Sequence, residues 1–370
     1  MKENIIWLDF DLVKNFMKDV FIKIGVPQED AEICAEILIE SDKRGIDSHG
    51  INRMKPIYFD RIRDGIQQAV TNFEIIKDNL ATAVVDGHHG MGHVIAKKSM
   101  DMAIEKAKKF GLGMVAVRNS THYGIAGYFV TMATEQNMIG ITGTNARPSI
   151  APTFGIENML GTNPLVFGIP TDEDFPFVLD CATSVSQRGK IEVYARTGKD
   201  MPLGWVIDRE GKSTVDSVKA LKSLIDGTAA LTPVGGIGED GAGFKGYGYA
   251  TVVEILSAAL QGGSFMKMLT GFDNGKKVPY KLGHFFIAIN IAHFTEVDEF
   301  KKITGDILRQ LRASDKMPGE DRIYTAGEKE YIARLERNGK GVPIGEDVQK
   351  EMISMRDATS LSQYIFPFEK

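Results

Sequence analysis

The sequence predicts an α/β protein in which helices from both ends of the chain flank a central α/β core. Three observations support this class: helical periodicity up to about residue 75, short apolar runs alternating with helices over 76–295, and amphipathic helices again after Glu296. The 370 residues exceed the usual length of one domain. We therefore expect a helical domain of residues 1–75 plus 296–370 and an α/β core of residues 76–295.

Helical patterning dominates the first part of the chain. It predicts helices at Asp9–Ile24 and Glu29–Arg44, then a shorter piece at Ile57–Asp64, where Pro56 marks a first turn or a kink. The second helix has basic residues in its last turn and stops at Gly45. Its apolar face consists of Ile33, Cys34, Ile37 and Leu38.

The middle of the chain alternates between short apolar runs and helices, which is typical of an α/β core. The expected strands are Ala81–Asp86, Gly113–Val117, Met138–Thr142, Pro164–Ile169, Phe175–Cys181, Gly204–Asp208 and Phe285–Ile291. The expected helices are Ala96–Phe110, Gly124–Gln136 and Tyr249–Leu260. Beyond Glu296, helices are expected at Gly327–Asn338 and Asp347–Asp357. They follow a longer helix with one apolar stripe of Phe300, Ile303, Ile307, Leu308 and Leu311.

Composition excludes several classes of protein. The formal net charge is −5, and no stripe of lysine and arginine with interleaved aromatics occurs, so a nucleic-acid partner is not expected. No apolar run reaches the roughly 18 residues of a membrane span. Cys34 and Cys181, the two cysteines, follow apolar patterns and are expected to be buried thiols, which suits a cytoplasmic location.

A site is predicted directly after the second helix, where Ser48, His49 and Arg53 lie on a turn. An imidazole beside a hydroxyl can transfer a proton, and a guanidinium four residues later can bind a carboxylate. The helix end would present these side chains from a rigid support.

Further short motifs that could line a site follow along the chain. They are Asn119-Ser120-Thr121-His122-Tyr123-Gly124, Gly161-Thr162-Asn163-Pro164, Asp180-Cys181-Ala182-Thr183-Ser184, Pro202-Leu203-Gly204-Trp205, Gly243-Phe244-Lys245-Gly246-Tyr247-Gly248 and Gly283-His284-Phe285-Phe286. In this order the sequence resembles, nearly end to end, the malate/L-lactate dehydrogenase family, which also contains sulfolactate, ureidoglycolate and diketogulonate dehydrogenases. The resemblance implies a three-layer α/β/α core with a mixed sheet that is not of the Rossmann type. It also implies NAD- or NADP-dependent oxidation of a small 2-hydroxy acid, with L-malate as first choice and lactate-like acids next.

The same resemblance assigns roles to residues of the predicted site. Proton transfer falls to His122 or His49, with a preference for His122, while Ser48 and His49 orient the substrate. Arg53 would clamp the substrate carboxylate. Arg147 would bind a second acidic group or the cofactor phosphates, and Thr162 and Asn163 a substrate or nicotinamide oxygen.

Gly111-Leu112-Gly113 resembles part of a dinucleotide-binding fingerprint, but a helix precedes these glycines and a strand follows them, which is the reverse of the order that the fingerprint requires. We therefore do not expect the cofactor to bind there. The glycine-rich stretch from Gly235 to Gly246 is the better phosphate candidate, since a helix opens after it at Tyr249. The family resemblance places the cofactor on Ala146, Asp180, Cys181, Ala182, Thr183, Ser184, Phe244, Lys245, Gly246, Gly327, Glu328 and Lys329.

Other histidines are expected to be structural. The glycines around His88, His89 and His93 disfavour a helix that would align the three imidazoles. A solvated turn is therefore favoured over a metal site, and no metal is expected. His284 and His293 flank an apolar strand and are expected to be hydrogen-bonded.

Alternatives to the 2-hydroxy acid dehydrogenase are a reductase of cyclic imino acids, a sulfolactate, ureidoglycolate or diketogulonate dehydrogenase, and a non-enzymatic NAD-binding protein. Ile57 stands where the ureidoglycolate branch has a tyrosine, which disfavours that substrate. The amphipathic termini and the family's habit predict a homodimer that shares residues across its interface.

Overall fold

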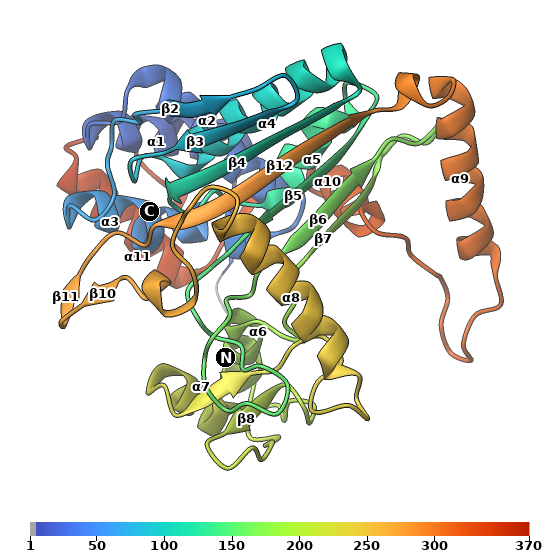
Figure 1. The fold of residues 1–370 in the computed structure, drawn as a ribbon. Helices are drawn as coiled ribbons and strands as arrows, with labels where there is room; N and C mark the ends of the chain where they lie inside the picture. The colour runs from blue at the N-terminus through green and yellow to red at the C-terminus, as the bar shows by residue number, and fades with distance from the viewer. Residues whose placement is uncertain (1–4, 370) are drawn as a thin grey trace.

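The computed structural model describes residues 5–369, and its centre is a mixed seven-stranded sheet (Figure 1). Only the β3–β4 pair is parallel; the other neighbours in this sheet are antiparallel. A Rossmann sheet is essentially parallel, so the prediction of a mixed, non-Rossmann α/β fold is confirmed. In spatial order the strands are β2 (Glu74–Asp78), β3 (Thr82–Asp86), β4 (Leu112–Ser120), β12 (Leu282–Asn290), β5 (Met138–Thr144), β6 (Leu165–Ile169) and β7 (Phe177–Cys181).

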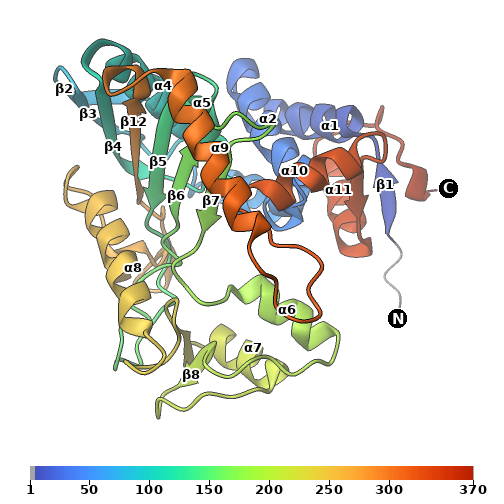
Figure 2. The same ribbon diagram turned by 90° about the vertical axis from the view of Figure 1, so that its right-hand side faces the viewer.

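Helices cover both faces of this sheet (Figure 2). One face packs against α4 (Gly92–Phe110) and α5 (Ala126–Thr134), and the other against α8 (Gly243–Ala258). Glycines permit the close approach: a Cβ on Gly113 of β4 would lie 2.0 Å from the Ala103 carbonyl oxygen of α4. The expected three layers are therefore present.

The two ends of the chain share one hydrophobic core beside the α4 side of the sheet. The helices of this layer are α1 (Phe10–Lys23), α2 (Gln28–Lys43), α3 (Asp60–Arg63), α10 (Glu328–Arg337) and α11 (Glu346–Ala358). Strand β1 (Ile6–Leu8) pairs with β13 (Val342–Ile344), which joins the termini directly. The helix expected at 57–64 is present only as the short α3, and a π-helical turn at Met54–Phe59 precedes it, where Pro56 lacks an amide hydrogen for a regular ladder.

A smaller unit lies below the sheet in Figures 1 and 2 and has its own apolar cluster around Trp205 and Leu231. It contains α6 (Arg188–Arg196), β8 (Val206–Asp208), α7 (Ser217–Ile225) and β9 (Ala229–Leu231). In this unit, the sequence pattern predicted only the strand near Asp208. Strand β2 of the main sheet was not predicted either. The helix α7 did carry a signal, because the Asp216 carboxylate caps it by accepting from the Lys219 amide.

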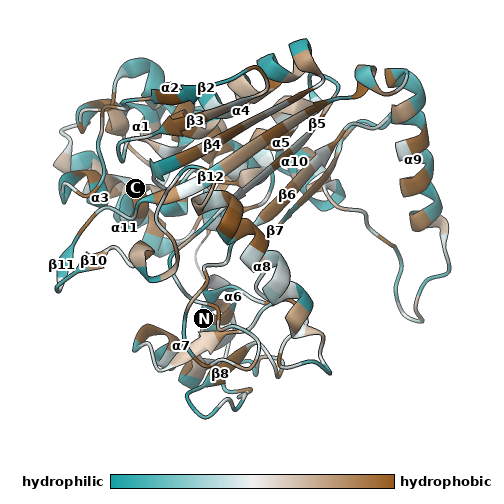
Figure 3. Ribbon diagram, viewed as in Figure 1, coloured by the Kyte–Doolittle hydropathy of each residue, from teal (hydrophilic) through white to brown (hydrophobic). Residues whose placement is uncertain are grey.

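Helix α9 (Val297–Ala313) stands apart from the sheet, and the chain returns from it to α10 (Figures 1 and 3). Leu308 is buried, but Ile303, Ile307 and Leu311 are each 54% exposed. Arg309 anchors the helix through a bidentate contact with Asp172. The predicted apolar stripe therefore exists, and most of it faces outward from the described chain.

Several details correct the sequence reading. Helix α8 begins at Gly243, six residues before the expected Tyr249, because glycines of the loop continue into its first turns. Cys34 is buried, but Cys181 is exposed on the edge strand β7. His93 is fully buried in the first turn of α4, so it does not belong to a solvated turn. Gly111 ends α4 with φ 81°, as the helix-stop interpretation predicted.

Within residues 5–369, we find no helix long and apolar enough to cross a membrane.

Candidate active site

The turn after α2 is held by a buried carboxyl group. Asp42 Oδ2 accepts from the Ile51 amide at 3.0 Å, and a Cβ on Gly50 would lie 1.9 Å from Asp42 Oδ1. Burial raises the pKa of Asp42 well above its usual value. The turn begins at Gly45, whose φ of 75° ends the helix as predicted. The sequence reading missed Asp42, although an acidic residue on the buried face of a helix was a usable signal.

The C-terminal helix α10 clamps the same turn. The Arg337 guanidinium donates to both carboxylate oxygens of Asp47 and to the Asp42 carbonyl oxygen. Arg334, one turn earlier on α10, donates to Glu40 of α2. The segment that carries Ser48 and His49 is therefore braced by residues nearly 300 positions away in sequence, which no local pattern could indicate.

All three predicted catalytic residues line one cavity of about 580 Å³. The imidazoles of His49 and His122 face each other across it, with ring centroids 5.8 Å apart and 23° between the planes. Predicted residues in its wall are Ser48, His49, Arg53, His122, Ala146, Thr162, Asp180 and Ala182. The structure thus unites motifs that are separated by up to about 130 residues.

His49 and Arg53 are organised through Ser48. The Ser48 hydroxyl lies 2.8 Å from His49 Nδ1, and Arg53 Nε donates to the Ser48 carbonyl oxygen at 2.6 Å. Burial and the nearby Arg53 charge lower the pKa of His49 to about 4. The imidazole is therefore neutral at pH 7, and the free ends of the guanidinium remain for an anionic ligand.

His122 is held from behind by Tyr58. Its Nδ1 lies 2.5 Å from the Tyr58 hydroxyl oxygen and accepts from the Gly124 amide at 3.3 Å. Burial lowers the pKa of His122 well below its usual value, and the His49 and Arg61 charges lower it further. Tyr58 belongs to the π-helical turn, a type of element that is frequent at functional sites. The sequence reading did not find it.

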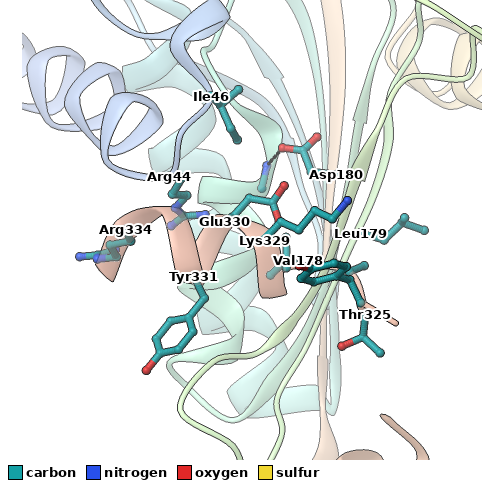
Figure 4. A pocket seen from close by; sticks show the side chains of 14 residues that line it. Arg44, Ile46, Val178, Leu179, Asp180, Thr325, Lys329, Glu330, Tyr331 and Arg334 are labelled. Atoms are coloured by element: carbon teal, nitrogen blue, oxygen red, sulfur yellow. Dashed lines mark hydrogen bonds between the residues drawn. The ribbon is translucent and has the colours of Figure 1, made fainter. Parts of the chain in front are cut away.

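A second cavity of about 390 Å³ adjoins the first, since Ile46 and Asp180 belong to both walls. Figure 4 shows Lys329 and Glu330 of α10 extending on the same side as Asp180. The Asp180 carboxylate accepts from the Gly127 amide at 2.6 Å. The surrounding protein raises the pKa of Asp180, and the Glu330 charge contributes, although part of the residue stays open to the cavities.

Other predicted residues lie outside the walls of these two cavities. Arg147 is exposed, and the Asn163 amide is used to hold α8, donating to Glu254 Oε2 at 2.7 Å. Glu328 is buried and accepts from the Thr325 amide. The remaining members of this group are Cys181 at the end of β7, Thr183 and Ser184 after it, and Phe244, Lys245 and Gly246 in the first turn of α8. Gly327, by contrast, lines the second cavity.

The other histidines take structural positions. His284 Nδ1 lies 2.7 Å from the Thr144 hydroxyl oxygen, which confirms its expected hydrogen bond, whereas His293 is exposed in a short 3₁₀ turn. His88 Nε2 lies 2.6 Å from Glu74 Oε2. Between residues 5 and 369, no three His, Cys, Asp or Glu side chains are grouped to hold a metal ion.

The cavities suit an anionic dinucleotide. Arg188 and Lys190 line the first cavity, and Lys329 and Arg44 line the second, so cations lie along the joined space. Gly327 borders the second cavity at the start of α10, where it adds no side chain. These residues fit the phosphates of a nicotinamide cofactor better than they fit a neutral ligand.

The chain belongs to the malate/L-lactate dehydrogenase family, whose family model matches residues 8–353. It is 43% identical to malate dehydrogenase from Pyrococcus horikoshii over 95% of this chain and 94% of that protein. Identity to L-sulfolactate dehydrogenase from Methanocaldococcus jannaschii is 39%, over 92% and 93% of the two chains. The crystal structure of malate dehydrogenase from Entamoeba histolytica superposes with a TM-score of 0.93 at 44% identity, covering 98% of this chain and all of that one.

Proposed function

We propose that this protein interconverts a small 2-hydroxy acid and its 2-oxo acid with NAD or NADP, and that L-malate is the preferred substrate. The observation that carries the proposal is the cavity in which two imidazoles, 5.8 Å apart, face each other beside Arg53. The names of the similar proteins, malate and sulfolactate dehydrogenases, support an acidic hydroxy acid.

The residues of the cavity divide the work of the reaction. The guanidinium of Arg53 binds the C1 carboxylate through its free Nη groups, since its Nε is fixed on the Ser48 carbonyl oxygen. His49 and His122 are neutral at pH 7, so the pair can receive the hydroxyl proton during oxidation. The bound nicotinamide supplies the hydride acceptor.

The cofactor is proposed to occupy the joined cavities. Ala146 and Ala182 would lie near its nicotinamide end, and Gly327 and Lys329 would contact its nucleotide. Lys245, exposed in the first turn of α8, is retained as a phosphate contact on the strength of the family resemblance. Arg147 is retained as the partner of a second substrate carboxylate.

A panel of substrates tests this proposal. Oxaloacetate, sulfopyruvate, pyruvate and a cyclic imino acid would each be assayed by NADH and NADPH absorbance with the full chain. We expect the highest kcat/KM with oxaloacetate. A preference for the cyclic imine would replace the proposal by its main alternative, and no turnover with any substrate would refute it.

We also propose that the protein is a cytoplasmic homodimer. The exposed stripe of Ile303, Ile307 and Leu311 on α9 supports this, because contiguous apolar surface of this kind marks protein interfaces. Sedimentation velocity combined with activity at high dilution is the test. A fully active monomer would contradict the dimer.

A further inference from the structure

The proton on His122 can be placed from its partners. A backbone amide is a donor and never an acceptor, so the contact from the Gly124 amide at 3.3 Å requires a bare Nδ1. The Tyr58 hydroxyl lies 2.5 Å from the same nitrogen. A neutral imidazole carries its one proton on the other nitrogen, here Nε2. Since Nδ1 is occupied from behind, Nε2 is the nitrogen left for the cavity.

Tyr58 is the stronger of the two donors. Its side chain is completely buried, and its ring packs against His93, with centroids 4.6 Å apart. Within the described chain, its hydroxyl meets His122 Nδ1 and the Gly124 amide. The amide cannot accept, so the hydroxyl proton points to Nδ1. The other charged or titratable groups that act on Tyr58 are Cys34, Arg61 and Arg53.

His49 differs from His122 in this respect. Its Nδ1 partner is the Ser48 hydroxyl, which can donate or accept a hydrogen bond. His49 can therefore carry its proton on Nδ1, directed at Ser48 Oγ, and leave Nε2 bare as a base. His122 cannot carry its proton on Nδ1, because the Gly124 amide contacts that nitrogen and can only donate a hydrogen bond.

We propose that Tyr58 is a positioning residue that holds His122 in its Nε2–H tautomer, so that His122 donates a hydrogen bond to the substrate C2 oxygen while His49 Nε2 takes the hydroxyl proton. This rests on the proposed function and reverses the preference for His122 as the base. In oxidation the C2–H electron pair leaves as hydride to the nicotinamide, and the O–H pair becomes the π bond of the new carbonyl. His49 ends as an imidazolium whose Nδ1–H donates to Ser48.

Nitrogen-15 NMR of the full chain labelled at histidine tests the tautomer without any cofactor or activity. The His122 signals, assigned by their loss in His122→Asn, should show a bare Nδ1 and a protonated Nε2 at neutral pH. Tyr58→Phe should shift the Nδ1 signal and lower kcat roughly tenfold, the value of about one net hydrogen bond, with unchanged NADH affinity. A protonated Nδ1 in the wild type, or a Tyr58→Phe variant with wild-type spectrum and turnover, would overturn the proposal.

Tyr364→Phe is the matched control. Tyr364 also belongs to the core of the terminal helical layer, and its hydroxyl donates to Asp19 Oδ2 at 2.7 Å, remote from the cavity. This variant should keep the wild-type His122 signals and turnover.

The division between the histidines has its own test. An asparagine amide still donates a hydrogen bond but cannot accept a proton as a base. His122→Asn should therefore retain at least roughly tenfold more turnover than His49→Asn. The reverse order would refute the division. If the wild type reduces no 2-oxo acid, the proposed function fails while the spectra still decide the tautomer.

Discussion

Replacing Arg53 by lysine keeps one positive charge at the cavity but removes the planar fork that binds a carboxylate. In the structure Arg53 Nε donates to the Ser48 carbonyl oxygen at 2.6 Å, which fixes the guanidinium and leaves its two Nη groups for the substrate. A lysine has a single ammonium and cannot hold Ser48 and two carboxylate oxygens in the same geometry. The loss of about one charged hydrogen bond is worth roughly 1 to 3 kcal/mol. We therefore expect kcat/KM to fall roughly 5- to 150-fold.

The assay is steady-state reduction of a 2-oxo acid followed by NADH absorbance, together with NADH binding by fluorescence titration. Cofactor affinity should hardly change, because the proposed nucleotide contacts Gly327 and Lys329 line the second cavity, whereas Arg53 lines only the first. Arg63→Lys is the control, since Arg63 is exposed on α3 and stacks over Phe59, 5.4 Å from its ring centroid. Wild-type efficiency of Arg53→Lys with every 2-oxo acid, or loss of NADH binding instead, would refute the assignment and favour Arg147 as the clamp.

Three further predictions concern the fold, the cofactor and pH. Gly50→Ala should lower the free energy of unfolding, measured in urea, by roughly 1 to 3 kcal/mol, because its Cβ would lie 1.9 Å from Asp42 Oδ1. In the control Gly248→Ala in α8, the new Cβ meets nothing within 4 Å and should not destabilise the protein, so equal effects of the two substitutions would contradict this account of the turn. Lys245→Ala should weaken NADH binding roughly tenfold or more with an unchanged thermal midpoint; equal titration curves would remove Lys245 from the site. Burial lowers the pKa of His93 to about 3, so the unfolded chain binds a proton below pH 6.5 that the folded chain does not, and stability is lost as pH falls from about 6.5 towards 3. Relative to His93→Gln, the wild type should lose up to about 1.4 kcal/mol more per pH unit in this window, and parallel pH profiles would show that His93 does not titrate this way.

Local sequence information was sufficient for the elements and for the type of site. The end of α2 at Gly45 followed from basic last-turn residues and a glycine, signals that act within one turn. Apart from the start of α8 and the segment around Pro56, the predicted helices and most strands of the core were found within a few residues of their bounds, because hydrophobic periodicity reflects burial of one face. Ser48, His49 and Arg53 were found for the same reason: they are neighbours along the chain.

Only the tertiary structure decided how these residues are held. The contact of Tyr58 with His122 joins positions 64 residues apart, and Arg337 reaches Asp47 across 290 residues. Such contacts depend on how layers pack, and no periodicity records them. Exposure was decided in the same way: Cys181 follows an apolar run, but β7 is the edge strand of the sheet, so its thiol is open. The sequence by itself determined which chemical groups are present, and the packing of the sheet and terminal helices determined which nitrogen of His122 is free to act.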